Sequence, residues 1–121
     1  MKRVNEEELE YDYDAYGAAL LDGEPFTGEA VEILGGAVVG LTTFVSGMED
    51  GPKKTWYKNG QIRTEGRASR VRGAAGVWSE WSESGQLAER KEFDEKGNMI
   101  SWRQWGEDGV LIKDKTYDPL W

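Results

Sequence analysis

Apolar residues recur along this chain at fixed distances on either side of a glycine. Four segments share the pattern, with an aromatic residue four positions before the glycine and an aliphatic residue or Met two positions after it. These segments are residues 56–62, 81–87, 93–99 and 105–111. Their glycines, Gly60, Gly85, Gly97 and Gly109, are separated by 25, 12 and 12 residues. The chain therefore contains a repeat of about 12 residues.

The dipeptides that contain these glycines predict hairpin turns. Asn59 precedes Gly60 and Asp108 precedes Gly109, and Asn-Gly and Asp-Gly favour turns that need a positive φ. The stretches between turns, such as 99–105, have the length of an ordinary strand. Turns this frequent leave no room for a stable helix. We therefore expect an all-β fold, an antiparallel meander of β-hairpin repeats forming a single curved or partly rolled sheet.

The pattern of side chains on each predicted strand bears on how the sheet packs. On the strand that follows Gly85, Leu87 and Phe93 flank Glu89 and Lys91 on one face, so neither face is continuously apolar. A two-layer sandwich is therefore disfavoured. The tryptophans at the repeat position are expected to form the core. They are Trp56, Trp81 and Trp105.

The composition excludes several kinds of catalytic and metal-binding site. The chain has 121 residues, the size of one domain, and contains no Cys and no His, which excludes thiolate and imidazole catalysis, disulfides and the usual zinc ligands. We expect a non-enzyme without metal or cofactor. The apolar run 33–45 is too interrupted to span a membrane, and the N-terminus lacks the apolar region of a secretory signal. A cytoplasmic protein is expected.

Charge divides the chain into unequal parts. Net charge is −8, from 23 acidic and 15 basic residues, and residues 1–32 carry the whole excess with ten acids and two bases. An acidic surface repels nucleic acid phosphates and anionic lipids but attracts a basic protein. We thus expect a protein partner, with no direct nucleic acid or membrane binding. Within the single domain 1–121 we distinguish an acidic N-terminal segment (1–19), the repeats (20–112) and a C-terminal strand or tail (113–121).

Residues 6–14 hold the sharpest feature outside the repeats. As a strand, this segment would present one acidic face, suited to the basic groove of a nuclease-like toxin. The acidic face would hold Glu8, Glu10, Asp12 and Asp14, and the opposite face Leu9, Tyr11 and Tyr13. The alternative is an edge strand or tail whose charges maintain solubility and block edge pairing.

Two further tryptophans, Trp78 and Trp102, have the parity opposite to the repeat position. They are candidate interface anchors, since Trp is enriched in binding hot spots; otherwise they cover a second small core. The candidate partner-binding residues are therefore Glu8, Glu10, Tyr11, Asp12, Tyr13, Asp14, Trp78 and Trp102. A basic cluster formed by Arg63, Arg67, Arg70 and Arg72 lacks interleaved aromatic residues, so a solvated loop balanced by acids is favoured over a phosphate site.

Several segments resemble the MORN-like repeat variant found in the bacterial YwqK antitoxin family. The resemblance is carried by residues 22–28 (DGEPFTG), 56–62 (WYKNGQI) with Glu65, and 76–81 (GVWSEW) leading to 85–87 (GQL). It spans about residues 20–112. It implies a β-hairpin repeat protein, in some members the neutraliser of a companion toxin, and it implies no catalytic residue.

Two main hypotheses follow. The first is an antitoxin or immunity protein that binds a basic toxin domain stoichiometrically and occludes its active site through an acidic, aromatic surface. The second is a non-catalytic β-repeat scaffold for protein–protein interaction. An enzyme with paired carboxylates is a third reading, although nothing singles out a pair among the 23 acids. The oligomeric state is not indicated by the sequence.

Overall fold

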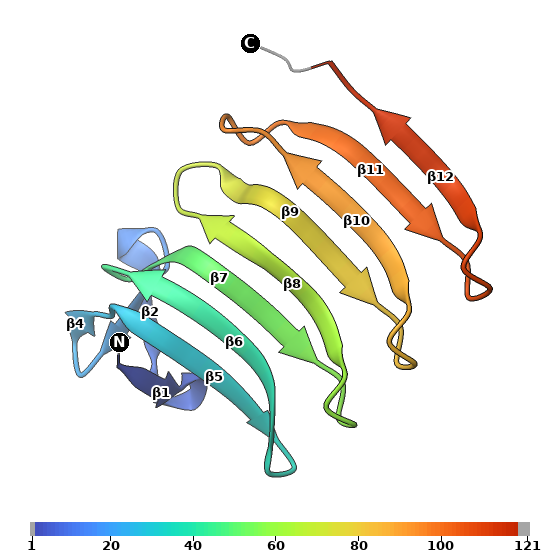
Figure 1. The fold of residues 1–121 in the computed structure, drawn as a ribbon. Coiled ribbons are helices and arrows are strands. Elements are labelled where there is room, and N and C mark those ends of the chain that lie inside the picture. The colour runs from blue at the N-terminus through green and yellow to red at the C-terminus, as the bar shows by residue number, and fades with distance from the viewer. Residues whose placement is uncertain (1, 119–121) are drawn as a thin grey trace.

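The computed structural model describes residues 2–118 and consists of one long open sheet and one small sheet. The long sheet has nine strands in the order β1-β5-β6-β7-β8-β9-β10-β11-β12, and it is not closed into a barrel (Figure 1). All neighbours are antiparallel except β1, which runs parallel to β5. The predicted all-β fold and antiparallel meander are confirmed. The last three residues of the expected C-terminal segment, 119–121, lie outside the described residues.

The strands of the long sheet differ in length between its two ends. They are β1 (Arg3–Asn5), β5 (Gly28–Leu34), β6 (Ala37–Val45), β7 (Met48–Trp56), β8 (Ile62–Ser69), β9 (Gly73–Trp81), β10 (Leu87–Phe93), β11 (Met99–Trp105) and β12 (Leu111–Thr116). The small sheet contains β2 (Glu10–Asp12), β3 (Ala18–Leu21) and β4 (Glu24–Pro25). Two short 3₁₀ helices, η1 (Glu6–Glu8) and η2 (Tyr13–Ala15), flank β2.

The four glycines of the repeat all form turns, as predicted. In the first, the Tyr57 N–H donates to the Gln61 carbonyl and the Gly60 N–H donates back to the Tyr57 carbonyl, at 2.9 and 3.0 Å. The same pair of bonds recurs around Gly85, Gly97 and Gly109, and each glycine has φ between 81° and 92°. This is a three-residue hairpin loop with the glycine in the left-handed region.

A register shift follows each of these turns. It explains why the aromatic residue stands four positions before the glycine and the aliphatic residue two positions after it. One strand carries one extra residue there, which is Arg63, Ala88, Ile100 or Ile112. The shift places the aromatic residue before the turn opposite the aliphatic residue after it. The resulting cross-strand pairs are Trp56 with Ile62, Trp81 with Leu87, Phe93 with Met99 and Trp105 with Leu111. Such pairs stabilise the sheet next to each bend.

The predicted core of repeat tryptophans is wrong. Trp56, Trp81 and Trp105 are only half-buried, because no second layer covers the middle of the long sheet. The buried apolar cluster lies at the N-terminal end and consists of Val4, Leu9, Ala19, Phe26, Ala30 and Phe44. There the rings of Phe26 and Phe44 lie 6.0 Å apart, centroid to centroid.

That cluster forms because residues 6–27, here called the cap, pack on one face of β5–β7. The Ala19 N–H donates to the Gly47 carbonyl and the Gly47 N–H to the Phe26 carbonyl, each at 2.8 Å, which fastens the cap to the β6–β7 turn. We call the sheet face that carries the cap the cap face. Beyond the cap this face is open over β8–β12. β1 and β12 are the two outermost strands of the long sheet, at its opposite ends (Figure 1).

Candidate functional site

The cap presents exposed tyrosines between carboxylates. Tyr11, Tyr13 and Tyr16 have 45%, 87% and 96% of their surface exposed, and the carboxylate-bearing residues Glu10 and Asp14 are exposed beside them. A single strand over residues 6–14, on which the acidic face would depend, does not form, because η1 and η2 interrupt it and leave only β2. Leu9 and Tyr11 therefore do not share one apolar face. Leu9 enters the core, whereas Tyr11 points outward.

Two of the predicted acidic contacts have structural roles. The Glu8 carboxylate accepts the Asn5 backbone N–H at 3.0 Å, while the Asn5 side chain accepts the Glu7 N–H, so the two form a capping box at η1. The Asp12 carboxylate accepts the Asp14 N–H at 3.0 Å and caps η2. These bonds fix the backbone of the acidic segment. The row of four equivalent carboxylates is replaced by a hydrogen-bonded turn with Glu10 and Asp14 at its surface.

The carboxylates of the cap repel one another. Burial raises the pKa of Glu6, and the nearby carboxylates of Glu32 and Glu7 raise it further, against the opposing effect of the Lys53 ammonium. Burial also raises the pKa of the Tyr11 phenol, with Glu6 adding to the shift. The negative potential of this end is therefore only partly compensated within the chain. A cation from outside would relieve it.

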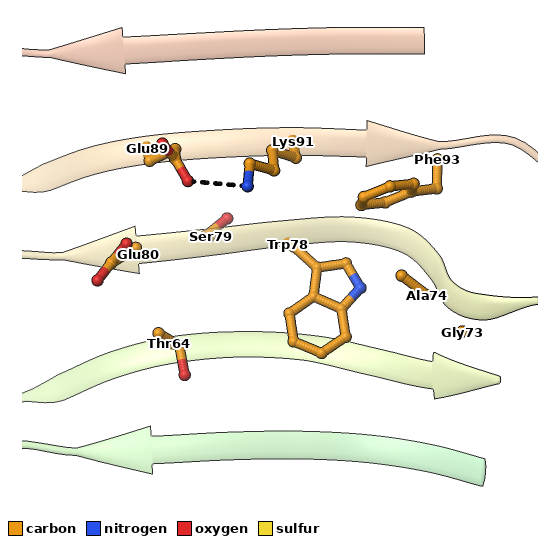
Figure 2. A pocket seen from close by; sticks show the side chains of 9 residues that line it. All are labelled: Thr64, Gly73, Ala74, Trp78, Ser79, Glu80, Glu89, Lys91 and Phe93. Atoms are coloured by element: carbon orange, nitrogen blue, oxygen red, sulfur yellow. Dashed lines mark ion pairs between the residues drawn. The ribbon is translucent and has the colours of Figure 1, made fainter. Parts of the chain in front are cut away.

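Trp78 lies flat against the cap face. Its ring covers Gly66 of β8 so closely that a Cβ at position 66 would overlap ring atoms. The ring extends from β9 across to β8 and borders a shallow hollow of about 390 Å³ with Phe93 and Ala74 (Figure 2). Its indole Nε1 is buried and has no hydrogen-bond partner among the described residues. One edge of this hollow is apolar and the other is charged, by Glu89 and Lys91.

Trp102 lies two strands further on the same face, opposite Lys91. The Lys113 ammonium lies 3.8 Å from the centroid of its ring and the Lys91 ammonium 5.7 Å, both within cation–π range. Its indole N–H donates to a Glu89 carboxylate oxygen at 3.3 Å. Trp102 is thus held by contacts within the sheet.

Glu89 is the centre of a polar network on this face. Its carboxylate also accepts the Gln104 side-chain N–H at 2.7 Å and pairs with the Lys91 ammonium at 3.4 Å. Partial burial by itself raises the pKa of Glu89, but the hydrogen bonds from Gln104 and Trp102 and the Lys91 charge outweigh it, so the pKa lies below its ordinary value of 4.5.

A pH dependence of stability follows from this lowered pKa. A carboxyl group with a depressed folded-state pKa stabilises the fold above its unfolded pKa, and that contribution is lost as the pH falls through the folded value. We expect Glu89→Gln to be less stable than wild type by about 1 kcal/mol at pH 7. The difference should shrink as the pH is lowered below the ordinary value of 4.5. Urea unfolding across that range measures it, and a difference that is constant with pH would contradict this role for Glu89.

The structure brings part of the predicted site together. A second hollow, beside the cap, is bordered by Tyr11, Tyr16 and Arg70, and it shares Gly73 with the hollow at Trp78. Tyr11, Tyr16 and Trp78 therefore flank adjoining hollows on one side of the molecule, and Tyr13 lines neither hollow. Trp102 lies beyond them, near the other end of the sheet. Glu10 and Asp14 stay at the surface of the cap.

Sequence reasoning missed two residues of this region. Tyr16 is the most exposed tyrosine, and it occupies a left-handed position with φ of 57°; the following Gly17 was the available signal for that turn. Gly66 was missed because a glycine inside a strand usually only weakens the strand, and it does not by itself indicate a contact with another residue. Its role depends on Trp78, which approaches from another strand.

The arginines of the basic cluster make separate contacts within the chain. They are all exposed. The Arg63 guanidinium lies 5.5 Å from the Tyr57 ring centroid, and Arg70 approaches Asp50 at 4.0 Å. Across residues 2–118, no three acidic side chains converge as metal ligands would. In the same residues, no helix has the length and hydrophobicity needed to cross a membrane.

Comparison with known families adds information on the repeats. Residues 49–67 and 75–95 match the MORN repeat variant. Each matched segment is one hairpin of the sheet, β7–β8 and β9–β10. No curated protein and no solved structure gives a significant match. The chain thus carries MORN-type β-hairpin repeats, as the resemblance predicted, and its antitoxin role is a hypothesis.

Proposed function

We propose that this protein is an antitoxin or immunity protein that covers a basic surface of a companion toxin with its acidic cap. The observation that carries the proposal is the set of exposed cap tyrosines, Tyr11, Tyr13 and Tyr16, between carboxylates on a fixed backbone. Large exposed apolar side chains within a charged rim are typical of protein interfaces. A rigid backbone reduces the entropy lost on binding.

Electrostatics support a basic protein as the partner. The pKa of Glu6 is raised by burial and by the nearby carboxylates of Glu32 and Glu7, and this group of carboxylates gains from a partner that supplies Lys or Arg. The same charge would repel phosphates and anionic headgroups, so the proposal includes neither nucleic acid nor membrane. The adjoining hollow with Trp78 would accept apolar side chains of the same partner. In this proposal the protein acts by occlusion and not by turnover.

The partner should be identified first. A tagged full-length chain would be used as bait in the native host, and captured proteins would be identified by mass spectrometry. The proposal expects a basic protein whose activity the purified chain inhibits at a one-to-one ratio. A captured partner that keeps its full activity in the complex would instead support the second hypothesis, the interaction scaffold, which the MORN-type repeats also favour.

Charge neutralisation in the cap tests the contact itself. In Glu10→Gln/Asp14→Asn both changed side chains are exposed and neither caps a helix. We expect this variant to bind the captured partner about 10-fold more slowly, with a weaker salt dependence, because steering by the acidic cap is reduced. Stopped-flow association at several salt concentrations measures this.

The matched control is Glu83→Gln/Glu107→Gln, which makes the same change in net charge in exposed turns at the far ends of β9 and β11. This control should associate at nearly the wild-type rate. An equal effect of both double variants would mean that net charge alone matters, and an unchanged rate for the cap variant would exclude the cap as the contact.

A further inference from the structure

The last strand of the long sheet, β12, has a neighbour on only one side among the described residues. The Tyr117 N–H donates to the Ile100 carbonyl of the β11 side at 3.0 Å. Because backbone groups alternate in direction along an antiparallel strand, Lys113 and Lys115 also direct theirs towards β11. The N–H and C=O groups of Asp114 and Thr116 therefore point away from the sheet and are free to pair with another strand.

This edge has no proline and no glycine to interrupt pairing, and its charges, at Lys113, Asp114 and Lys115, restrict which strand can pair with it. Leu111 and Ile112 are 44% and 68% exposed. The opposite edge strand, β1, has only three residues. Figure 1 shows β12 at the end of the sheet far from the cap. A strand that pairs with β12 would therefore extend the sheet without touching the cap.

The charges along β12 specify the kind of strand that fits. Lys113 and Lys115 lie on the cap face, opposite Gln104 and Trp102, and within residues 2–118 neither ammonium forms an ion pair with a carboxylate. Asp114, on the other face, is already paired with Arg103 at 3.1 Å. The charge on the cap face of β12 is thus positive. The Lys113 ammonium also contacts the Trp102 ring, at 3.8 Å from its centroid, and the exposed carboxylate of Asp118 follows the strand. Opposite charges facing each other across two strands stabilise their pairing.

A second copy of the chain is a poor occupant of this edge. A two-fold axis perpendicular to the sheet would join two β12 strands antiparallel, with side chains of the same face opposite one another. A register centred on Asp114 then places Lys113 opposite Lys115 of the second copy. A register centred on Lys113 places that lysine opposite Lys113 of the second copy, and a register centred on Lys115 does the same for Lys115. Like charges in these positions disfavour self-pairing in these three registers.

We propose that β12 binds an extended acidic segment of a partner protein as an additional antiparallel strand, with carboxylates opposite Lys113 and Lys115. The backbone of Asp114 and Thr116 would supply the hydrogen bonds, and the two lysines would supply the preference for acidic side chains. This surface is separate from the cap, so the chain would have one site for a basic surface and another for an acidic strand.

Short peptides test the edge directly. Two seven-residue blocked peptides would be added to the full chain, one alternating Thr with Glu and the other alternating Thr with Lys. We expect the Glu peptide to slow amide hydrogen exchange at residues 114 and 116. It should bind about 10-fold more tightly than the Lys peptide, since two opposite-charge pairs replace two like-charge pairs. Lys113→Glu/Lys115→Glu should reverse the preference.

Asp114→Pro provides a backbone test. Proline at 114 removes an N–H that points outward, so the ladder to β11 is retained while the added strand loses a donor. We expect this variant to lose binding of the Glu peptide and Asp114→Ala to keep it. Equal binding of both peptides, exchange protection absent from residues 114 and 116, or dimers of the free chain joined through β12 would overturn the proposal. Since Glu10→Gln/Asp14→Asn should leave peptide binding unchanged, failure here is distinct from failure of the proposed cap function.

Discussion

Replacing Phe44 with alanine is expected to lower the free energy of unfolding by about 3–5 kcal/mol, the usual cost of removing a large ring from a core. Phe44 is 5% exposed and packs against Phe26, in the region where the cap and the long sheet form two layers. Its loss should loosen the cap from β5–β7. Urea unfolding followed by circular dichroism measures the change, and partner binding through the cap should weaken in parallel.

Trp105→Ala is the matched control for this prediction. It removes a larger ring that is only half-buried on a face without a second layer. Less buried apolar surface is therefore lost for each atom removed. We expect its cost to be smaller than that of Phe44→Ala. If Trp105→Ala were the more destabilising change, the stability of the molecule would lie in the repeat aromatics, as the sequence alone predicted, and not beneath the cap.

Gly66→Ala is expected to destabilise the protein by about 1–3 kcal/mol, the cost of forcing extra volume into a packed contact. An alanine in a strand normally improves on glycine, so the sign of the effect depends on the Trp78 ring that covers position 66. The displaced ring should become more exposed. Chemical denaturation gives the free energy, and tryptophan fluorescence should shift to longer wavelength.

A double-variant cycle isolates the contact between these two residues. In a Trp78→Ala background the space over position 66 is vacant, so adding Gly66→Ala should be neutral or stabilising. The same destabilisation in both backgrounds would show that the alanine at 66 acts through the backbone of β8 and not through Trp78. This variant also tests whether the hollow at Trp78 contributes to partner binding.

The repeats could be predicted because their signals are local. Asn-Gly at 59–60 and Asp-Gly at 108–109 favour turns with a positive φ, and the distance between such turns sets the strand length. The aromatic and aliphatic residues around each turn were visible as a pattern, but their pairing needed the register shift. Nothing in the sequence marks a residue such as Arg63 as the extra one.

The cap and the core could not be predicted in the same way. The fold of residues 6–14 depends on Leu9 entering a cluster with Phe26 and Phe44, and a strict two-residue alternation hides that difference between Leu9 and Tyr11. By contrast, the alternation of side chains placed Trp78 and Trp102 correctly on one face, which is the cap face. Whether a second layer covers that face depends on distant parts of the chain.

The strands from β8 to β11 contact little besides their two neighbours, and β12 has one neighbour among the described residues, whereas β5–β7 are also covered by the cap. Cooperativity in such a linear array passes only from one repeat to the next. Local opening should therefore be easiest at the C-terminal end and become rarer towards the N-terminus. The molecule would open first at β12, while the end covered by the cap keeps its shape.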